Sequence, residues 1–157
     1  MIIDGCAVNL RRYPPIDPAR SASLGIPTWL YGHEPPNPFA SHNAKYFANS
    51  EREAGLLAIA TYGVVFAPGS AGTIQEVFQD ACQNHYVTAG VVSPMVFLGR
   101  AYWTVTKPVY PLLEHLAAGR DYARWLSLTD DGDAVVAAIA DYDRARAAGR
   151  LQTPSSA

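Results

Sequence analysis

The feature that most constrains this chain is an apolar run, a turn and an amphipathic helix in immediate succession between residues 64 and 84. Residues 64–67 (VVFA) form a short continuous apolar run, which is typical of a strand covered on both faces. Residues 68–72 (PGSAG) have the composition of a turn. The helix predicted from Thr73 to about Asn84 has one apolar stripe, made of Ile74, Val77, Phe78 and Ala81. A buried strand is therefore expected to lead through a turn directly into a helix.

Strands and helices continue to alternate along the rest of the chain. Helical periodicity and capping residues predict three further helices. They lie over residues 51–61, over residues 105–118 with a beginning near Pro108, and from Asp130 and Asp131 onward. Apolar runs predict three further strands, over residues 25–31, 95–99 and 125–128. Two proline-rich stretches, residues 14–18 and 34–38, disfavour helix and are expected to be extended loops.

This alternation favours parallel strands joined by helices through right-handed crossovers. The predicted fold class is α/β, a Rossmann-like three-layer α/β/α arrangement with a mostly parallel sheet. A single domain of this Rossmann-like kind is expected over residues 1–148, followed by a flexible tail over residues 149–157. Ligands of such sheets bind at the carboxyl ends of the strands. The turn at residues 68–72 follows a strand and therefore lies where a ligand is expected.

Charge and composition argue against several classes of function. The formal net charge is -2, whereas proteins that bind the phosphate backbone of nucleic acid need a basic surface. No apolar run approaches the roughly 20 residues that span a bilayer. The apolar start has its arginines after it, which is the wrong order for a signal peptide. Cys6 and Cys82 lack the spacing of a zinc site. We expect a cytoplasmic protein with no metal, no cofactor, and neither nucleic acid nor membrane as a partner.

The turn has the properties of a phosphate-binding loop. Gly69 and Gly72 allow the backbone to approach a ligand without interference from a Cβ atom. The following helix directs free N–H groups and a partial positive charge at the turn, and Thr73 adds a hydroxyl group. It is not a Walker A loop, because no Gly-Lys-Ser/Thr is present. The alternative is structural: Thr73 is the N-cap of the helix and Glu76 is its capping-box partner.

Arg52 is the second unusual feature. Ser50 and Glu53 have the spacing of a capping box at the start of the 51–61 helix. Arg52 then lies in the first turn, where a cation opposes the helix dipole. Its spacing from Leu56 directs it toward the apolar stripe. One interpretation is an ion pair with a nearby carboxylate on the surface. The other is that Arg52 faces an anionic ligand or a catalytic carboxylate.

Together these pieces resemble the Lonely Guy (LOG) family of cytokinin-activating nucleoside-monophosphate phosphoribohydrolases, and the larger nucleotide 5′-monophosphate nucleosidases related to it. The family pattern is an arginine in a helix, a short strand, and then Pro-Gly-Gly-x-Gly-Thr-x-x-Glu. Here the arginine is Arg52, the strand is residues 64–67, and residues 68–76 read PGSAGTIQE. Residues 33–38 (HEPPNP) resemble the family's proline-rich segment before that helix. The resemblance covers roughly residues 26–140.

The resemblance implies hydrolysis of the N-glycosidic bond of a nucleoside 5′-monophosphate, with release of the free base and ribose 5-phosphate. Glu76 would approach the ribose and stabilise developing positive charge or orient water, and Arg52 would position Glu76 or the substrate. Family members form dimers, so a homodimer or higher oligomer is expected. The phosphate would be bound by the loop residues, Pro68, Gly69, Ser70, Ala71, Gly72 and Thr73.

Two departures from the family pattern concern the phosphate site. Ser70 stands in place of the second glycine of the family loop. Residues 1–25 contain only two glycines, Gly5 and Gly25, so the family's opening strand and second glycine-rich loop are expected to be missing. Both departures favour an alternative function. In that alternative the chain is a non-catalytic protein that binds or carries a nucleotide or a phosphorylated cofactor on the same fold.

Two other kinds of chemistry find little support in the sequence. Relatives of the family have been labelled amino-acid decarboxylases, and such enzymes form a Schiff base between lysine and pyridoxal phosphate. Neither Lys45 nor Lys107 lies in a recognisable cofactor motif. The histidines form no recognisable catalytic array; they are His33, His42, His85 and His115.

Overall fold

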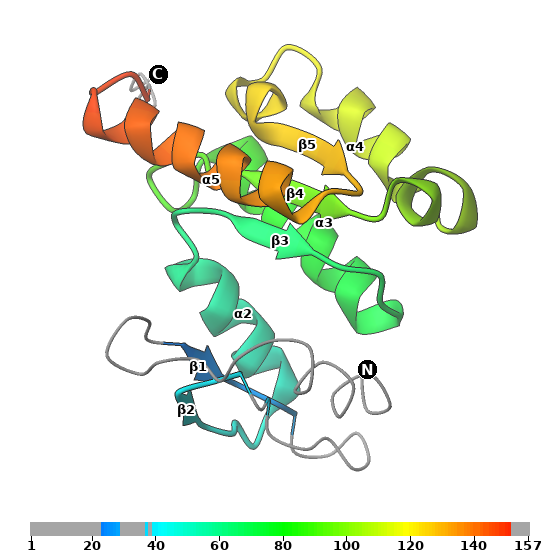
Figure 1. Cartoon of the computed structure of the whole chain (residues 1–157), viewed down its shortest axis with the longest axis vertical. Helices are drawn as coiled ribbons and strands as arrows, with labels where there is room; N and C mark the ends of the chain where they lie inside the picture. Colours follow the sequence, from blue (N-terminus) through cyan, green and yellow to red (C-terminus); the bar gives the residue numbers. More distant parts are fainter. Residues whose placement is uncertain (1–22, 29–36, 38, 152–157) are drawn as a thin grey trace. The chain divides into compact units, whose positions relative to one another are not determined.

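The computed structural model of the protein describes residues 23–28, 37 and 39–151 (Figure 1). The chain divides into two compact units, Met1–Gly55 and Leu56–Ala157. Several sequence-based expectations fall outside the described residues: the proline-rich stretch 14–18, residues 34–36 and 38 of the second stretch, and residues 152–157 of the expected tail. The expectation that a glycine-rich loop is missing near the start also falls largely on residues outside this description.

A two-stranded parallel sheet lies in the first unit. β1 (Leu24–Gly25) pairs with β2 (His42–Asn43). The side chains of Ser23 and Ser41 reinforce this pairing, because each hydroxyl accepts a hydrogen bond from the backbone N–H of the other residue, at 3.1 and 2.8 Å. The strand predicted over residues 25–31 is therefore wrong in extent. The observed strand begins one residue earlier and ends at Gly25, and residues 29–31 lie outside the described part of the chain.

Helix α2 (Asn49–Ile59) begins two residues before the predicted 51–61 helix. Ser50 therefore lies within the first turn, and the capping box predicted for Ser50 and Glu53 is wrong. The carboxylate of Glu53 instead accepts a hydrogen bond from the side-chain amide of Asn49, one helical turn earlier. A side-chain contact between residues four apart thus takes the place of the expected cap.

The second unit contains a three-stranded parallel sheet in the order β3-β4-β5. Its strands are β3 (Val64–Phe66), β4 (Met95–Leu98) and β5 (Leu126–Thr129). In the register of the sheet, Phe97 lies opposite Phe66 on one side and opposite Leu128 on the other. The three predicted strands are confirmed to within one residue at each end, and the α/β class with a parallel sheet is confirmed.

Helices connect these strands in sequence order. α3 (Ala71–Tyr86) joins β3 to β4, and α5 (Gly132–Ala147) follows β5. Asp131 caps α5, because its side chain accepts a hydrogen bond from the Asp133 N–H at 3.0 Å. The prediction that aspartates open the last helix is thereby confirmed.

The connection from β4 to β5 differs from the single helix predicted over residues 105–118. It contains three short helices: the π-helix η1 (Tyr102–Thr106), the α-helix α4 (Val109–Ala117) and the 3-10 helix η2 (Asp121–Trp125). Pro108 has no N–H with which to continue a helix, and it is the N-cap residue of α4. The prediction of a helix that begins near Pro108 is confirmed by α4, whereas the π-helix before this proline and the 3-10 helix after α4 were not predicted.

Different helices cover the two faces of the sheet. Phe66 and Phe97 pack in one core with residues of α3 and α4, including Val77 and Leu113. Val96 points to the opposite face, because successive side chains of a strand alternate, and it is fully buried there. α5 contacts both β4 and β5, and Figure 1 shows it in front of the sheet with α3 behind. The second unit therefore has the predicted three layers.

The strand order determines where a ligand is expected. Two right-handed crossovers in the same direction along a sheet place their helices on one face, as α3 and α4 are placed here. Because the strands are parallel, their carboxyl ends lie along the same edge of the sheet. Ligands of open α/β sheets bind at this edge. The segments that emerge there are residues 67–70, 99–101 and 130–131.

Asp80 is a carboxyl group in the buried part of α3. Its exposed fraction is 2%, and its Oδ2 atom has no hydrogen-bond partner within the described part of the chain. Burial away from water raises the pKa of Asp80 from its ordinary value of 3.8 to about 7. The group is therefore neutral in mildly acidic solution and carries a poorly compensated charge in alkaline solution.

Asp80→Asn is expected to stabilise the protein above neutral pH. Folding raises the pKa of Asp80 to about 7, so the stability supplied by its protonated form is lost as the pH rises through that value. Relative to the variant, the wild-type free energy of unfolding should fall by up to about 4 kcal/mol between about pH 4 and about pH 8. Urea denaturation measures this difference. Asp143→Asn, at an exposed position of α5, controls for the lost charge. The same pH dependence of stability in all three proteins would contradict the raised pKa of Asp80.

Candidate functional site

The candidate phosphate-binding loop lies at the carboxyl end of β3. Ser70 is the N-cap residue of α3, and its side chain makes no capping hydrogen bond. The prediction that Thr73 is the N-cap, with Glu76 as its capping-box partner, is wrong because α3 begins at Ala71 and Thr73 lies within its first turn. The first N–H groups of α3 are thus not capped by that serine side chain. These N–H groups point out of the start of the helix, which is the direction from which an anion binds to a helix N-terminus.

Thr73 explains why residue 69 is a glycine. A Cβ atom at Gly69 would lie only 2.7 Å from the Cβ atom of Thr73 and 3.0 Å from its Cγ2 atom. The threonine side chain therefore packs back onto the loop backbone. Pro68 makes a second close approach, because a Cβ atom at Gly99 would lie 3.2 Å from its Cγ atom. Gly99 itself has φ +105°, which strongly favours glycine. The loops after β3 and β4 thus lie side by side.

Two side chains from the segment after β4 bind the backbone of the loop. The Tyr102 hydroxyl and the Lys107 ammonium group both donate hydrogen bonds to the Gly69 carbonyl oxygen, the latter at 2.9 Å. Lys107 also lies 5.7 Å from the centre of the Tyr102 ring. A half-buried cation therefore binds the backbone of the candidate phosphate-binding loop. This role of Lys107 was not predicted from the sequence, where the residue was weighed only as a Schiff-base lysine.

A hydrogen-bonded pair joins the segments after β4 and β5 at the same edge. The backbone N–H of Arg100 donates to Asp130 Oδ1 at 2.7 Å, and the Arg100 guanidinium donates to the Leu128 carbonyl at 2.6 Å. The Arg100 Nε and Asp130 Oδ2 atoms are 4.0 Å apart, and both side chains are exposed. The net strength of such an exposed pair is small. Its position places one basic and one acidic group at the carboxyl end of the sheet.

Glu76 is carried by α3 and is half-buried. It lies three residues after Thr73, so the two are neighbours on the helix surface. The loop residues and Glu76 therefore come from one continuous strand–loop–helix segment of the second unit. This local arrangement is what the sequence motif predicts; the catalytic role of Glu76 stays a prediction.

Arg52 belongs to the part of α2 that lies in the first unit. Its Nε atom donates to Asn49 Oδ1 at 2.9 Å, and its NH1 atom donates to the Ile26 carbonyl oxygen at 3.4 Å. Its NH2 atom lies 3.5 Å from Glu53 Oε1, and the two side chains are 15% and 3% exposed. Arg52 therefore makes the expected ion pair, but in a largely buried setting. Glu53 also offsets the unfavourable position of a cation in a first helical turn.

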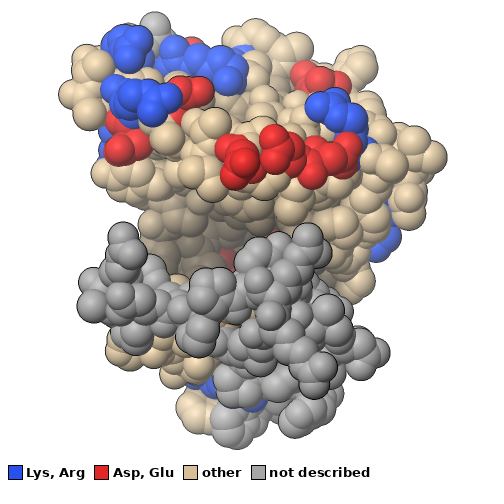
Figure 2. Space-filling model, viewed as in Figure 1, with Lys and Arg blue, Asp and Glu red and all other residues tan. Residues whose placement is uncertain are grey.

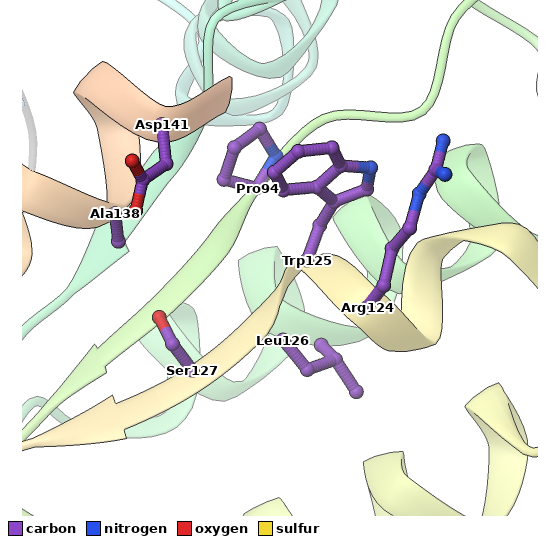
Figure 3. A pocket seen from close by; sticks show the side chains of 7 residues that line it. All are labelled: Pro94, Arg124, Trp125, Leu126, Ser127, Ala138 and Asp141. Atoms are coloured by element: carbon purple, nitrogen blue, oxygen red, sulfur yellow. The ribbon is translucent and has the colours of Figure 1, made fainter. Parts of the chain in front are cut away.

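Two cavities lie at the opposite end of the sheet from the loop. One, of about 160 Å³, lies between the start of β5 and α5, and Figure 3 shows Trp125 and Arg124 on one side of it and Asp141 on the other. The second, of about 190 Å³, includes Asn84 near the end of α3 and Arg120 before β5. Both are smaller than the roughly 300–1,000 Å³ of typical small-molecule pockets. We therefore assign neither of them to a nucleotide.

Charged side chains of both signs are present on the surface. On the face shown in Figure 2, basic and acidic side chains of the second unit adjoin one another in several places, and a row of acidic side chains lies across the middle of this unit. Among the described residues, no group of three or more His, Cys, Asp or Glu side chains is placed to hold a metal ion. None of the helices in the described ranges is long and apolar enough to cross a membrane.

Comparisons with known proteins leave the function to be argued from the site itself. No protein-family model matches the chain, and no curated protein matches it at a significant level.

Gly69→Ala is expected to destabilise the protein by about 1–3 kcal/mol, because the added methyl group would overlap the Thr73 side chain. Chemical denaturation followed by circular dichroism measures the change. Gly132→Ala is the matched control, since a Cβ atom there meets nothing within 4 Å, and it should leave stability unchanged or slightly higher. Equal stability of the two variants would show that the close packing of Gly69 against Thr73 is not present in solution.

Proposed function

We propose that the chain hydrolyses the N-glycosidic bond of nucleoside 5′-monophosphates. Water adds to C1′ of the ribose, the bond to the base breaks, and the products are ribose 5-phosphate and the protonated free base. The observation that carries this proposal is the loop at the carboxyl end of β3, which leads into α3 with no side-chain cap from Ser70 and is followed by Glu76. The resemblance of residues 68–76 to the Lonely Guy family motif supports it.

The loop supplies binding and orientation of the substrate. A phosphate group would accept hydrogen bonds from backbone N–H groups at the start of α3 and from the Thr73 hydroxyl. The ammonium group of Lys107, on the carbonyl side of the Gly69–Ser70 peptide, adds a favourable longer-range charge for a phosphate dianion. A phosphate fixed in this way holds the attached ribose in one position, which lowers the entropic part of the barrier.

Glu76 supplies the electrostatic part of catalysis. Departure of the base leaves oxocarbenium-like positive charge on the ribose, and a fixed carboxylate stabilises that charge more strongly than mobile water does. The same carboxylate is able to orient the attacking water. The catalytic role that the family resemblance implies for Arg52 stays a prediction; the contacts of this arginine within α2 are with Asn49 and Glu53.

Glu76→Gln is expected to lower the rate of base release from AMP and CMP by at least about 10²-fold, because the variant loses the negative charge opposite the developing cation. Chromatography of the released base measures the rate. Glu114→Gln, at an exposed position of α4, is the matched control and should keep full activity. Adenosine, which lacks the phosphate, should be cleaved at least about 10²-fold less efficiently than AMP.

The same experiment separates hydrolysis from simple binding. Tight binding of AMP in calorimetry, with no base released by the wild type, would replace the enzyme by a nucleotide-binding or carrier protein. Failure of the folded wild type to bind or cleave any nucleoside monophosphate would overturn both.

We also propose that the chain forms a homodimer or a higher oligomer. Exposed apolar side chains of the second unit, among them Ile59, Tyr62 and Val65, favour self-association. Light scattering is expected to give at least twice the chain mass of 16.9 kDa. A monomer at micromolar and higher concentrations would contradict this.

A further inference from the structure

The carbonyl group of Gly69 accepts two hydrogen bonds from one distant segment. The donors are the hydroxyl of Tyr102 and the ammonium group of Lys107, which stand 33 and 38 residues further along the chain. A glycine in a loop has wide backbone freedom, so its peptide groups rotate easily unless other groups hold them. Two donors on one carbonyl oxygen are therefore a specific restraint on this loop.

The π-helix brings these two donors together. The Lys107 N–H donates to the Tyr102 carbonyl oxygen at 2.8 Å, which is the five-residue spacing of a π-helix. In an α-helix, with 3.6 residues per turn, residues five apart lie on different sides. Here both side chains reach the same carbonyl. The unusual helix thus has a structural consequence at the candidate site.

Restraint of the carbonyl also fixes the N–H group on the other side of the same peptide bond. Because the peptide is planar and trans, the Ser70 N–H points in the direction opposite to the Gly69 carbonyl. It therefore points away from Tyr102 and Lys107. If the peptide turned over, the partly negative carbonyl oxygen would take the place of this donor and would repel an anion.

We propose that Tyr102 and Lys107 are positioning residues, which hold the Gly69–Ser70 peptide in the orientation that presents its N–H group to a phosphomonoester. This inference rests on the proposed function, and it explains how a loop that contains the permissive Gly69 keeps one backbone orientation. Lys107 contributes a hydrogen bond and a charge, whereas Tyr102 contributes a hydrogen bond alone.

The test compares Tyr102→Phe, Lys107→Met and Lys107→Arg with the wild type. Tyr102→Phe removes one neutral donor and should raise the KM for AMP by about 2- to 10-fold. Lys107→Met removes a charged donor and should raise it by about 10- to 100-fold, while Lys107→Arg should restore most of the affinity. In each case kcat should change much less than KM, because the lost contact acts on substrate and transition state alike.

Two substitutions serve as matched controls. Tyr86→Phe changes an exposed tyrosine at the end of α3, and Arg150→Met removes an exposed cation beyond α5. Both should leave KM unchanged. A loss of affinity in Arg150→Met equal to that in Lys107→Met would show that only the overall charge matters, and it would overturn the positioning role of Lys107.

A measurement without ligand keeps this inference separate from the proposed function. Hydrogen exchange of the backbone amides over residues 69–74 should be faster in Tyr102→Phe and Lys107→Met than in the wild type and the controls. Faster exchange, in a protein that neither binds nor cleaves AMP, would support the restraint and overturn the proposed function. Unchanged exchange together with an unchanged KM, in an active enzyme, would overturn the inference and leave the function standing.

Discussion

The second unit depends on the complete burial of its central strand. Met95, Val96 and Phe97 of β4 are each 0% exposed, so both faces of this strand are covered and both of its edges are paired. Such a strand requires a neighbour on each side and a helix layer above and below. The positions of β3 and β5, of α3 and α4 on one face, and of α5 on the other all follow from that requirement. The loops at the carboxyl edge take their places as a result.

The candidate site uses this edge in two ways. One strand–loop–helix segment supplies the glycines, Thr73 and Glu76, and the next connection supplies the donors that hold the Gly69 carbonyl. The parallel pairing of β3 with β4 brings these segments together, because it places the ends of both strands at one edge. The sheet thereby restrains a loop whose glycines would otherwise allow several backbone conformations. Precise backbone donors on a rigid support are what electrostatic catalysis needs.

Segments with a clear apolar pattern were predictable from the sequence, and the residues that cap the starts of α2 and α3 were not. The runs at residues 64–67 and 95–99 have one plausible structure, because only a strand buries so short an apolar segment. The patterns at Ser50 and Thr73 also satisfy the capping-box rule, yet both residues lie inside helices. Helix ends are decided by a few competing hydrogen bonds, which spacing alone does not rank. The role of Lys107 could not be predicted, because it depends on the π-helix, and this helix leaves no periodic signal in the sequence.

The restraint on Gly69 means that the loop motif is not a self-contained module. If residues 64–76 were transplanted into another α/β scaffold, the glycines, the threonine and the glutamate would move with them. The Gly69 carbonyl would lose its two donors, which come from residues 102 and 107. The transplanted loop would then keep its amino-acid pattern and lose the fixed orientation of its peptide. Substitution of Tyr102 and Lys107 in the native chain would have the same effect, although the sequence of the loop motif would be unchanged.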